Sequence, residues 1–247
     1  MVKQERAART RETLIRSAAE VFNREGYSTA SVTTISSVAG VSNGALHYHF
    51  ANKAALADAV EEAALDTLLA VTRGTPPARA GRHVQRVVDA THGLAGALRT
   101  DPVLRAGFSL SGEPSRRGGG GLRERWGVWV EQTLEEAEAA GELNSATAAH
   151  DVVTAVVAAT VGFEALGGRD AGWLAASTIT RFWRVLLPTL IPADRLADLD
   201  AAGKRSPWRR AEAGPWSPGR CLSEGQDLLA PVSPQPASLR PSAAPIF

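Results

Sequence analysis

The chain has 247 residues and is 44% hydrophobic, which is enough to bury one sizeable core or two smaller ones. A single cysteine, Cys221, excludes an intramolecular disulfide framework and fits a reducing cytoplasm. We find no run of about 18 predominantly apolar residues, and no hydrophobic signal segment after Met1. We therefore expect a cytoplasmic protein with no membrane partner.

The formal net charge is only +1, but it is unevenly distributed along the chain. Residues 1–50 carry 6 Lys or Arg against 4 Asp or Glu, residues 51–202 carry 15 against 19, and residues 203–247 carry 6 against 3. The two ends are cationic and the middle is acidic. This distribution favours an N-terminus that faces nucleic acid.

The first 52 residues predict three helices, because apolar residues recur there at helical spacing between helix-ending and helix-starting residues. Ser31 and Ser42 can each cap the N-terminus of a helix, whereas Gly26 and Gly40 each end the helix before them. The predicted helices cover 6–25, 31–39 and 42–49.

From residue 53 onward the composition is alanine-rich, with mixed charge and no strand pattern, so we predict an all-α fold. Residues 1–52 would form an N-terminal three-helix domain, residues 53–202 a second helical domain, and residues 203–247 a disordered tail. The tail contains 8 of the 14 prolines. The further predicted helices are 53–73, 80–100, 102–111, 122–140, 147–167 and 171–191.

The last two of these helices, 147–167 and 171–191, are apolar nearly all round, so more than one face of each must be covered. One cover is the core of the same chain, and the other is a second copy. We therefore predict a homodimer through these two helices. The alternative is that a large monomeric core covers them.

Residues 31–50 have the organisation of a helix-turn-helix. Ala39, Gly40 and Val41 make the tight turn, and the second helix keeps a polar outer face that can reach base edges. The small core beneath it is predicted to contain Ile35, Val38, Ala39, Val41, Leu46 and Phe50.

The stretch from Gly26 to Lys53 resembles the DNA-binding signature of the TetR family of repressors. Residues 42–57, the pair Gly26 and Tyr27, and Asp101–Gly107 make the chain most similar to the γ-butyrolactone autoregulator receptors and pseudo-receptors of actinomycetes. The resemblance implies that residues 1–52 form a three-helix DNA-binding domain and residues 53–202 a helical ligand-binding and dimerisation domain. The resemblance implies a repressor that binds a pseudo-palindromic double-stranded operator on the nucleoid and is released by a small apolar inducer, a γ-butyrolactone-type signal or an antibiotic. Such a regulator controls antibiotic biosynthesis.

Two alternatives stay open within that resemblance: a pseudo-receptor, which the sequence pI of about 8.0 favours, and a ligand-independent DNA-binding regulator. An enzyme is not expected, because His83, His92 and His150 are dispersed and no nucleophile motif or phosphate loop is present. We expect no cofactor and no metal.

No Asp, Glu, Lys or Arg lies between Gly26 and Asn52, although phosphate neutralisation dominates affinity for DNA. Positive charge must therefore come from the N-terminal arm, which includes Arg11, from Lys53, and from the N-termini of the two capped helices. Neutral hydroxyls and rings would fix the position against phosphate oxygens. The predicted DNA-binding residues are Arg6, Arg9, Ser31, Thr33, Ser42, Asn43, Gly44, His47, Tyr48 and Lys53.

Asn43 is the best candidate for reading a base, because an amide can bond to adenine N6 and N7 in the major groove. Many relatives have Lys at this position, and His47 stands where the family usually has Tyr. His49 is expected to pack beside the turn.

On the ligand side, the resemblance matches Trp126 to a tryptophan that those receptors place against the ligand, and Trp129 lies one turn along. An indole offers a large apolar surface with one N–H donor. Many relatives carry Gln where this chain has Ala64. Residues 53–73 would act as a lever that moves the two recognition helices away from a spacing of about 34–36 Å. The other residues predicted to line the cavity are Phe108, Thr160, Val161 and Trp183.

Overall fold

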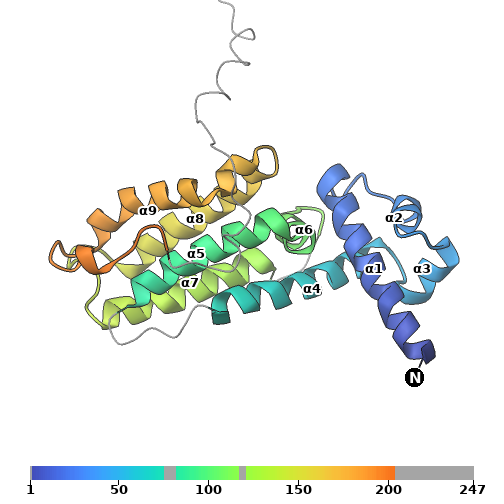
Figure 1. Ribbon diagram of the computed structural model, residues 1–247, viewed down its shortest axis with the longest axis horizontal. Coiled ribbons are helices and arrows are strands. Elements are labelled where there is room, and N and C mark those ends of the chain that lie inside the picture. Colours follow the sequence, from blue (N-terminus) through green and yellow to red (C-terminus); the bar gives the residue numbers. More distant parts are fainter. Residues whose placement is uncertain (1, 75–81, 117–120, 204–247) are drawn as a thin grey trace, which may run out of the picture. The chain divides into compact units, whose positions relative to one another are not determined.

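The computed structural model describes residues 2–74, 82–116 and 121–203. Within these ranges the regular elements are helices and no β-strand occurs, which confirms the all-α fold (Figure 1). The predicted tail lies outside the described residues, apart from Gly203. The α-helices are α1 (Val2–Glu25), α2 (Val32–Val38), α3 (Asn43–His49), α4 (Lys53–Gly74), α5 (His83–Thr100), α6 (Pro102–Leu110), α7 (Leu122–Ala139), α8 (Ala149–Gly167) and α9 (Ala176–Leu190).

Two short 3-10 helices follow α8 and α9: η1 (Ala171–Leu174) and η2 (Leu196–Asp198). The single helix predicted over 171–191 is therefore wrong. The Asp170 side chain accepts a hydrogen bond from the Gly172 N–H at 2.8 Å and starts η1. Ala175 then takes an extended conformation, with φ −67° and ψ 143°, before α9 begins.

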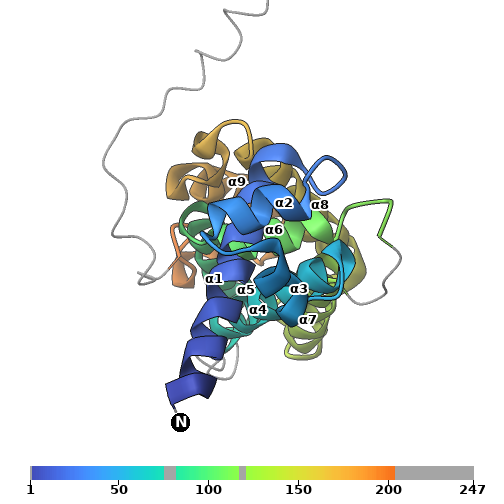
Figure 2. The ribbon, with the colours of Figure 1, turned by 90° about the vertical axis from the view of Figure 1, so that its right-hand side faces the viewer.

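We call α1, α2, α3 and residues 53–60 of α4 the head. α2 packs against both α1 and α3, and the two views show these three helices gathered at one end of the chain's fold (Figures 1 and 2). The turn between α2 and α3 contains Gly40 at φ +67°, a left-handed conformation that favours glycine. The main buried side chains of the head are Leu14, Ala18, Val21, Phe22, Ile35, Leu46, Phe50, Leu56 and Val60.

The small core predicted beneath the helix-turn-helix is correct except for Val38, whose side chain is 43% exposed. Val38 is the last residue of α2. Ala39 and Val41, which follow it in the turn, pack against the head core instead.

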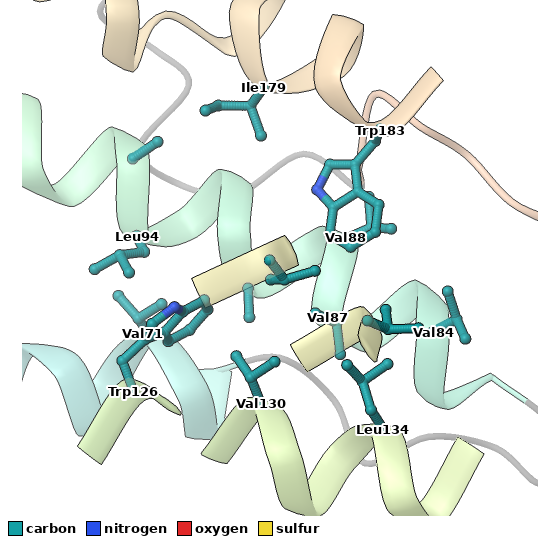
Figure 3. Close-up of a cluster of buried hydrophobic side chains, with 14 of the residues drawn as sticks. Val71, Val84, Val87, Val88, Leu94, Trp126, Val130, Leu134, Ile179 and Trp183 are labelled. Carbon is teal, nitrogen blue, oxygen red and sulfur yellow. The ribbon is translucent and has the colours of Figure 1, made fainter. Parts of the chain in front are cut away.

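We call α5, α7, α8, α9 and residues 61–74 of α4 the body. α7 packs against both α5 and α8, and α9 packs against α5. The body encloses a larger apolar cluster, part of which is drawn in Figure 3. Its largest fully buried side chains are Trp126, Trp183, Phe108, Leu94, Leu98, Leu104, Leu134 and Ile179.

Helices α4 and α6 contribute to both cores. On α4, Leu56 and Val60 belong to the head core, whereas Leu68 belongs to the body core. On α6, Leu110 lies in the head core and Phe108 in the body core. The head core therefore reaches past residue 52, and the proposed domain limits at 52 and 202 stay predictions.

The contact between α4 and α6 is close. A Cβ atom added to Gly107 would lie 2.5 Å from the Ala64 Cβ atom and 3.3 Å from a methyl group of Leu122. Glycine and alanine at this crossing let the two backbones approach one another. The position where many relatives carry Gln is thus a packing contact in this chain.

Helix α8 corrects one expectation from the sequence. It has 19 residues and contains an 18-residue window with a mean hydropathy of 1.4, so by length and composition it could cross a membrane. Charged residues such as Asp151 and Glu164 made this run look shorter than it is. Only 28% of that window is fully buried inside the chain, and several of its other side chains, among them Val153, Val157 and Phe163, are only partly covered by the body core.

Candidate DNA-binding and ligand-binding sites

The outer surface of α2 and α3 is polar and exposed, as predicted from the sequence. Thr33 on α2 is exposed, and so are Asn43, Gly44 and His47 on α3. Tyr48 is 82% exposed, although it is aromatic. These five predicted residues lie on the same two-helix unit.

The two predicted helix caps are present. Ser31 Oγ accepts a hydrogen bond from the Thr34 N–H at 3.0 Å, and Ser42 Oγ accepts one from the Ala45 N–H at 3.1 Å. Each hydroxyl thus satisfies a backbone donor that the helix leaves open. Contacts between these serines and DNA stay predictions.

Asn43 has an intramolecular partner that the sequence did not indicate. The Ser36 hydroxyl on α2 lies 2.5 Å from Asn43 Oδ1 on α3 and 3.0 Å from the Thr33 carbonyl oxygen. Ser36 is only 4% exposed, whereas Asn43 is exposed. The contact joins the buried side of α2 to the first residue of α3.

Lys53, predicted to contact phosphate, lies at the start of α4 and points to the turn between α1 and α2. Its Nζ atom donates to the carbonyl oxygens of Tyr27 at 2.8 Å, Ser28 at 3.2 Å and Ala30 at 3.0 Å. Nζ also lies 4.6 Å from the centre of the Tyr27 ring. An ammonium group has three N–H donors, so this geometry supplies an acceptor for each. A phosphate contact by Lys53 stays a prediction.

The arginines of α1 differ from one another. Arg6 and Arg9 are exposed. The Arg11 guanidinium lies 5.4 Å from the centre of the Phe50 ring, and one of its nitrogens is 3.9 Å from a Glu62 carboxylate oxygen on α4. Arg11 therefore makes intramolecular contacts, while Arg6 and Arg9 offer exposed charge at the end of α1.

Most of the predicted ligand residues form the body core. Trp126, Phe108 and Trp183 are 0% exposed and Thr160 is 4% exposed, whereas Val161 is half-buried. The Trp126 ring stacks on the Trp129 ring with 5.3 Å between their centres. The structure thus brings the two neighbouring tryptophans of α7 together, as their spacing predicts.

Two buried hydrogen-bond donors in this core lack a partner within the described residues. They are the indole Nε1 atoms of Trp126 and Trp183. Trp126 extends from α7 and Trp183 from α9, and both indoles lie among the side chains of the same cluster (Figure 3). An unpaired buried N–H costs free energy, and an acceptor atom of a ligand would remove this cost.

Sequence reasoning missed a buried ion pair between α7 and α8. Arg123 donates to a Glu164 carboxylate oxygen at 2.7 Å, and Glu164 is only 7% exposed. Burial raises the pKa of Glu164, although Arg123 lowers it in part. A single acidic residue late in an otherwise apolar helix was the signal that could have indicated this pair.

A second missed cluster joins the segment after α6 to α4 and the head. Arg116 binds Asp58 at 2.7 Å and also binds Glu61, and its guanidinium lies 5.1 Å from the centre of the Tyr27 ring. Burial acts to lower the pKa of Arg116, but the charge of Glu61 and the bonds to both carboxylates raise it overall. The cation therefore stays charged and links three segments of the chain.

Residues 14–60 match the family described as bacterial regulatory proteins, tetR family. These residues run from α1 to the first part of α4 and include the whole α2–α3 unit. The A-factor receptor protein of Streptomyces griseus is 30% identical over 208 residues, which are 83% of this chain and 72% of that protein. The similarity thus extends beyond the head.

Solved structures show similar folds over most of their length. A γ-butyrolactone receptor described as ArpA-like has a TM-score of 0.69 at 28% identity, covering 80% of this chain and 96% of its own. TylP, a TetR regulator from Streptomyces fradiae, has a TM-score of 0.59 at 31% identity, covering 79% and 93%. CprB from Streptomyces coelicolor, solved with its operator sequence, has a TM-score of 0.66 at 26% identity, covering 78% and 94%.

Proposed function

Because this chain belongs to the TetR family of DNA-binding bacterial regulators and is related to the γ-butyrolactone receptors, we propose that it is a homodimeric repressor released from its operator by a small ligand. Its ligand would be a γ-butyrolactone-type signal or an apolar antibiotic, and its targets would be genes of secondary metabolism. The protein would act in the cytoplasm, on the nucleoid. The exposed polar surface of α2 and α3 is the observation that carries this proposal.

DNA binding would use one α3 from each of two copies in successive major grooves of a pseudo-palindromic operator. Thr33, Asn43, Gly44, His47 and Tyr48 would face the groove or its phosphates. Among the basic residues, Arg6 and Arg9 supply exposed positive charge near this surface. Few phosphates would be neutralised by side chains, so we expect a modest dependence of affinity on salt.

The homodimer would form through α8 and α9. Leu166 on α8 is 41% exposed and Val185 on α9 is 77% exposed. Phe163 and Phe182, one from each helix, contact each other with 5.6 Å between ring centres and are only half-buried. A second copy on this face would remove these apolar side chains from water.

The inducer would enter the body core beside Trp126. The unpaired N–H groups of Trp126 and Trp183 fit a ligand that carries oxygen acceptors on an apolar frame. Binding would favour a different tilt of α4, because Leu68 on α4 packs in this core while Leu56 holds the head. A coupling free energy of about 1–3 kcal/mol would release the operator about 5- to 150-fold.

A second candidate is a regulator, or pseudo-receptor, that does not answer to a lactone. Its support is the filled state of the core, in which Trp126, Phe108 and Trp183 have no exposed surface. The Ala64–Gly107 contact also leaves no room for a polar side chain at that point of α4. In this case the protein would bind its operator in the same way but would remain bound to it in the presence of lactones.

Fluorescence anisotropy tests the proposal. The full chain would first select an operator from random duplexes, and γ-butyrolactones and polyketide antibiotics would then be added to the complex. We expect release by at least one compound, and weaker release with Trp126→Phe, which keeps an aromatic ring without the N–H. Release by none of these compounds would favour the second candidate. Failure to select any palindromic duplex at low salt would overturn the repressor itself.

Sedimentation velocity tests the dimer with a matched pair of variants. Val185→Glu places a charge on the proposed interface, whereas Val128→Glu places the same charge on α7 at a side chain that is 46% exposed. We expect Val185→Glu to shift the protein towards monomer and Val128→Glu to leave the dimer intact. Equal sedimentation of both variants would contradict an interface through α9.

A further inference from the structure

Ser36 is a buried hydroxyl in the head that lies behind the DNA-facing surface. It is 4% exposed, beside the fully buried Ile35 of the same helix. A buried hydroxyl needs a hydrogen-bond partner. Two oxygen atoms lie within reach: the Thr33 carbonyl at 3.0 Å and Asn43 Oδ1 at 2.5 Å.

A serine hydroxyl has one hydrogen, so it can donate to only one of these two oxygens at a time. The contact with Asn43 is shorter by half an ångström. We assign the hydrogen to Asn43 Oδ1 for this reason. The bond then joins a fixed, buried atom of α2 to an exposed amide at the start of α3.

With its hydrogen on Oδ1, Ser36 holds the oxygen of the Asn43 amide, rather than Nδ2, towards α2; an amide turned over would have to donate from Nδ2 to the Ser36 oxygen while the Ser36 hydrogen bonds the Thr33 carbonyl. An amide oxygen has two lone pairs, and Ser36 occupies one of them. The second lone pair of Oδ1 and the Nδ2 donors stay available to a base. Without Ser36 the amide can turn over about its last torsion, which exchanges the positions of donor and acceptor.

We propose that Ser36 is a positioning residue for sequence recognition, which fixes the amide of Asn43 in the orientation that matches the edge of adenine. Adenine presents an N6 donor and an N7 acceptor in the major groove. Oδ1 accepts from N6 and Nδ2 donates to N7 only when the amide is turned the right way. Ser36 itself does not touch DNA. The inference rests on the proposed operator binding.

The test is a base-substitution profile, measured by fluorescence anisotropy on the operator that the wild-type protein selects. Each base pair of a half-site is replaced in turn, and Asn43→Ala identifies the position that Asn43 reads. Wild type is expected to discriminate there by about 5- to 150-fold. Ser36→Ala is expected to lose most of this discrimination while its salt slope and its affinity for unrelated duplexes stay unchanged.

Two controls separate positioning from general stability. Ser37→Ala removes a hydroxyl from the exposed neighbouring position of the same helix and is expected to leave the profile as in wild type. Ser36→Thr keeps a hydroxyl and is expected to retain discrimination at that base pair. The melting temperature of each variant, measured in parallel, reports its folding.

A double-mutant cycle with Asn43→Ala gives the sharper criterion. If Ser36 acts through Asn43, adding Ser36→Ala to Asn43→Ala has no further effect on the profile. Additive effects, a uniform loss on every duplex, or an unchanged profile in Ser36→Ala would each overturn the inference while the regulator stands. Absence of any selected operator would instead overturn the proposed function.

Discussion

The exposed residues proposed to contact DNA lie outside the core of the head, whereas the residues proposed to contact the ligand lie inside the core of the body. In the head, Tyr48 is 82% exposed and the buried side chains lie beneath it, whereas in the body Trp126 is 0% exposed and is itself part of the core. A side chain outside a core can change without loss of packing, but a side chain inside one cannot. DNA contacts by exposed residues such as Tyr48 are therefore separable from the stability of the head, whereas ligand contacts by Trp126 are joined to the stability of the body.

The largest expected effect is in the body. Trp126→Ala removes a fully buried indole, and such truncations cost about 3–5 kcal/mol of the free energy of unfolding because the cavity does not close completely. Trp129→Ala is the matched control, since its ring is only half-buried on the same helix. Urea denaturation measures both. A cost for Trp129→Ala that equals or exceeds that for Trp126→Ala would break the comparison.

The next effect concerns the helices that the two cores share. Gly107→Ala would place a Cβ atom 2.5 Å from that of Ala64. Overpacking of this kind lowers the free energy of unfolding by about 1–3 kcal/mol. Gly127→Ala on α7 is the control, because its nearest neighbour would be an ordinary contact at 3.9 Å. Urea denaturation is expected to show that Gly107→Ala is less stable than wild type. Gly127→Ala is expected to be at least as stable as wild type.

A smaller effect is expected at Lys53, where the head joins α4. Lys53→Met leaves three carbonyl oxygens of the α1–α2 turn without their donor, and we expect a loss of about 1–2 kcal/mol, because water can replace part of the bonding. The salt dependence of operator affinity distinguishes this role from a phosphate contact. A slope that falls by about 2 per dimer would show that Lys53 binds phosphate.

The smallest effect on stability is expected at Tyr48, on the surface of the head. Tyr48→Ala is expected to change the free energy of unfolding by no more than about 0.5 kcal/mol, because the ring is almost fully exposed. Operator affinity, measured by anisotropy, is expected to fall on all sequences alike if the ring contacts phosphate. A large loss of thermal stability with intact binding would reverse the contrast drawn between head and body.

The parts of the fold that follow from local chemistry were predicted well from the sequence. Ser31 and Ser42 were recognised as caps and Gly40 as the turn residue, because each acts on backbone groups within about three residues of itself. The break at Ala175 was missed because the apolar pattern continues across it, although Asp170 and Gly172 just before it start a separate short helix and could have indicated the break.

The parts of the site that depend on distant contacts could not be predicted. The phosphate contact of Lys53 stays a prediction, but its bonds to carbonyl oxygens could not be foreseen, because those oxygens are 23 to 26 residues away in the sequence. The Ser36–Asn43 bond crosses the turn and has no signature in either residue alone. Arg123 and Glu164 are 41 residues apart, and only their burial in the fold shows that they form a pair.

The sharing of α4 and α6 between the two cores limits how this protein can move. Leu56 and Leu110 hold the two helices to the head, and Leu68 and Phe108 hold the same helices to the body. A free rotation of α1, α2 and α3 relative to α4 about residue 52 would expose Leu56 and Leu110 to water. We therefore expect the head to reorient relative to the body by small sliding of packed helices, in which α6 moves together with α4, and not by motion about a flexible hinge.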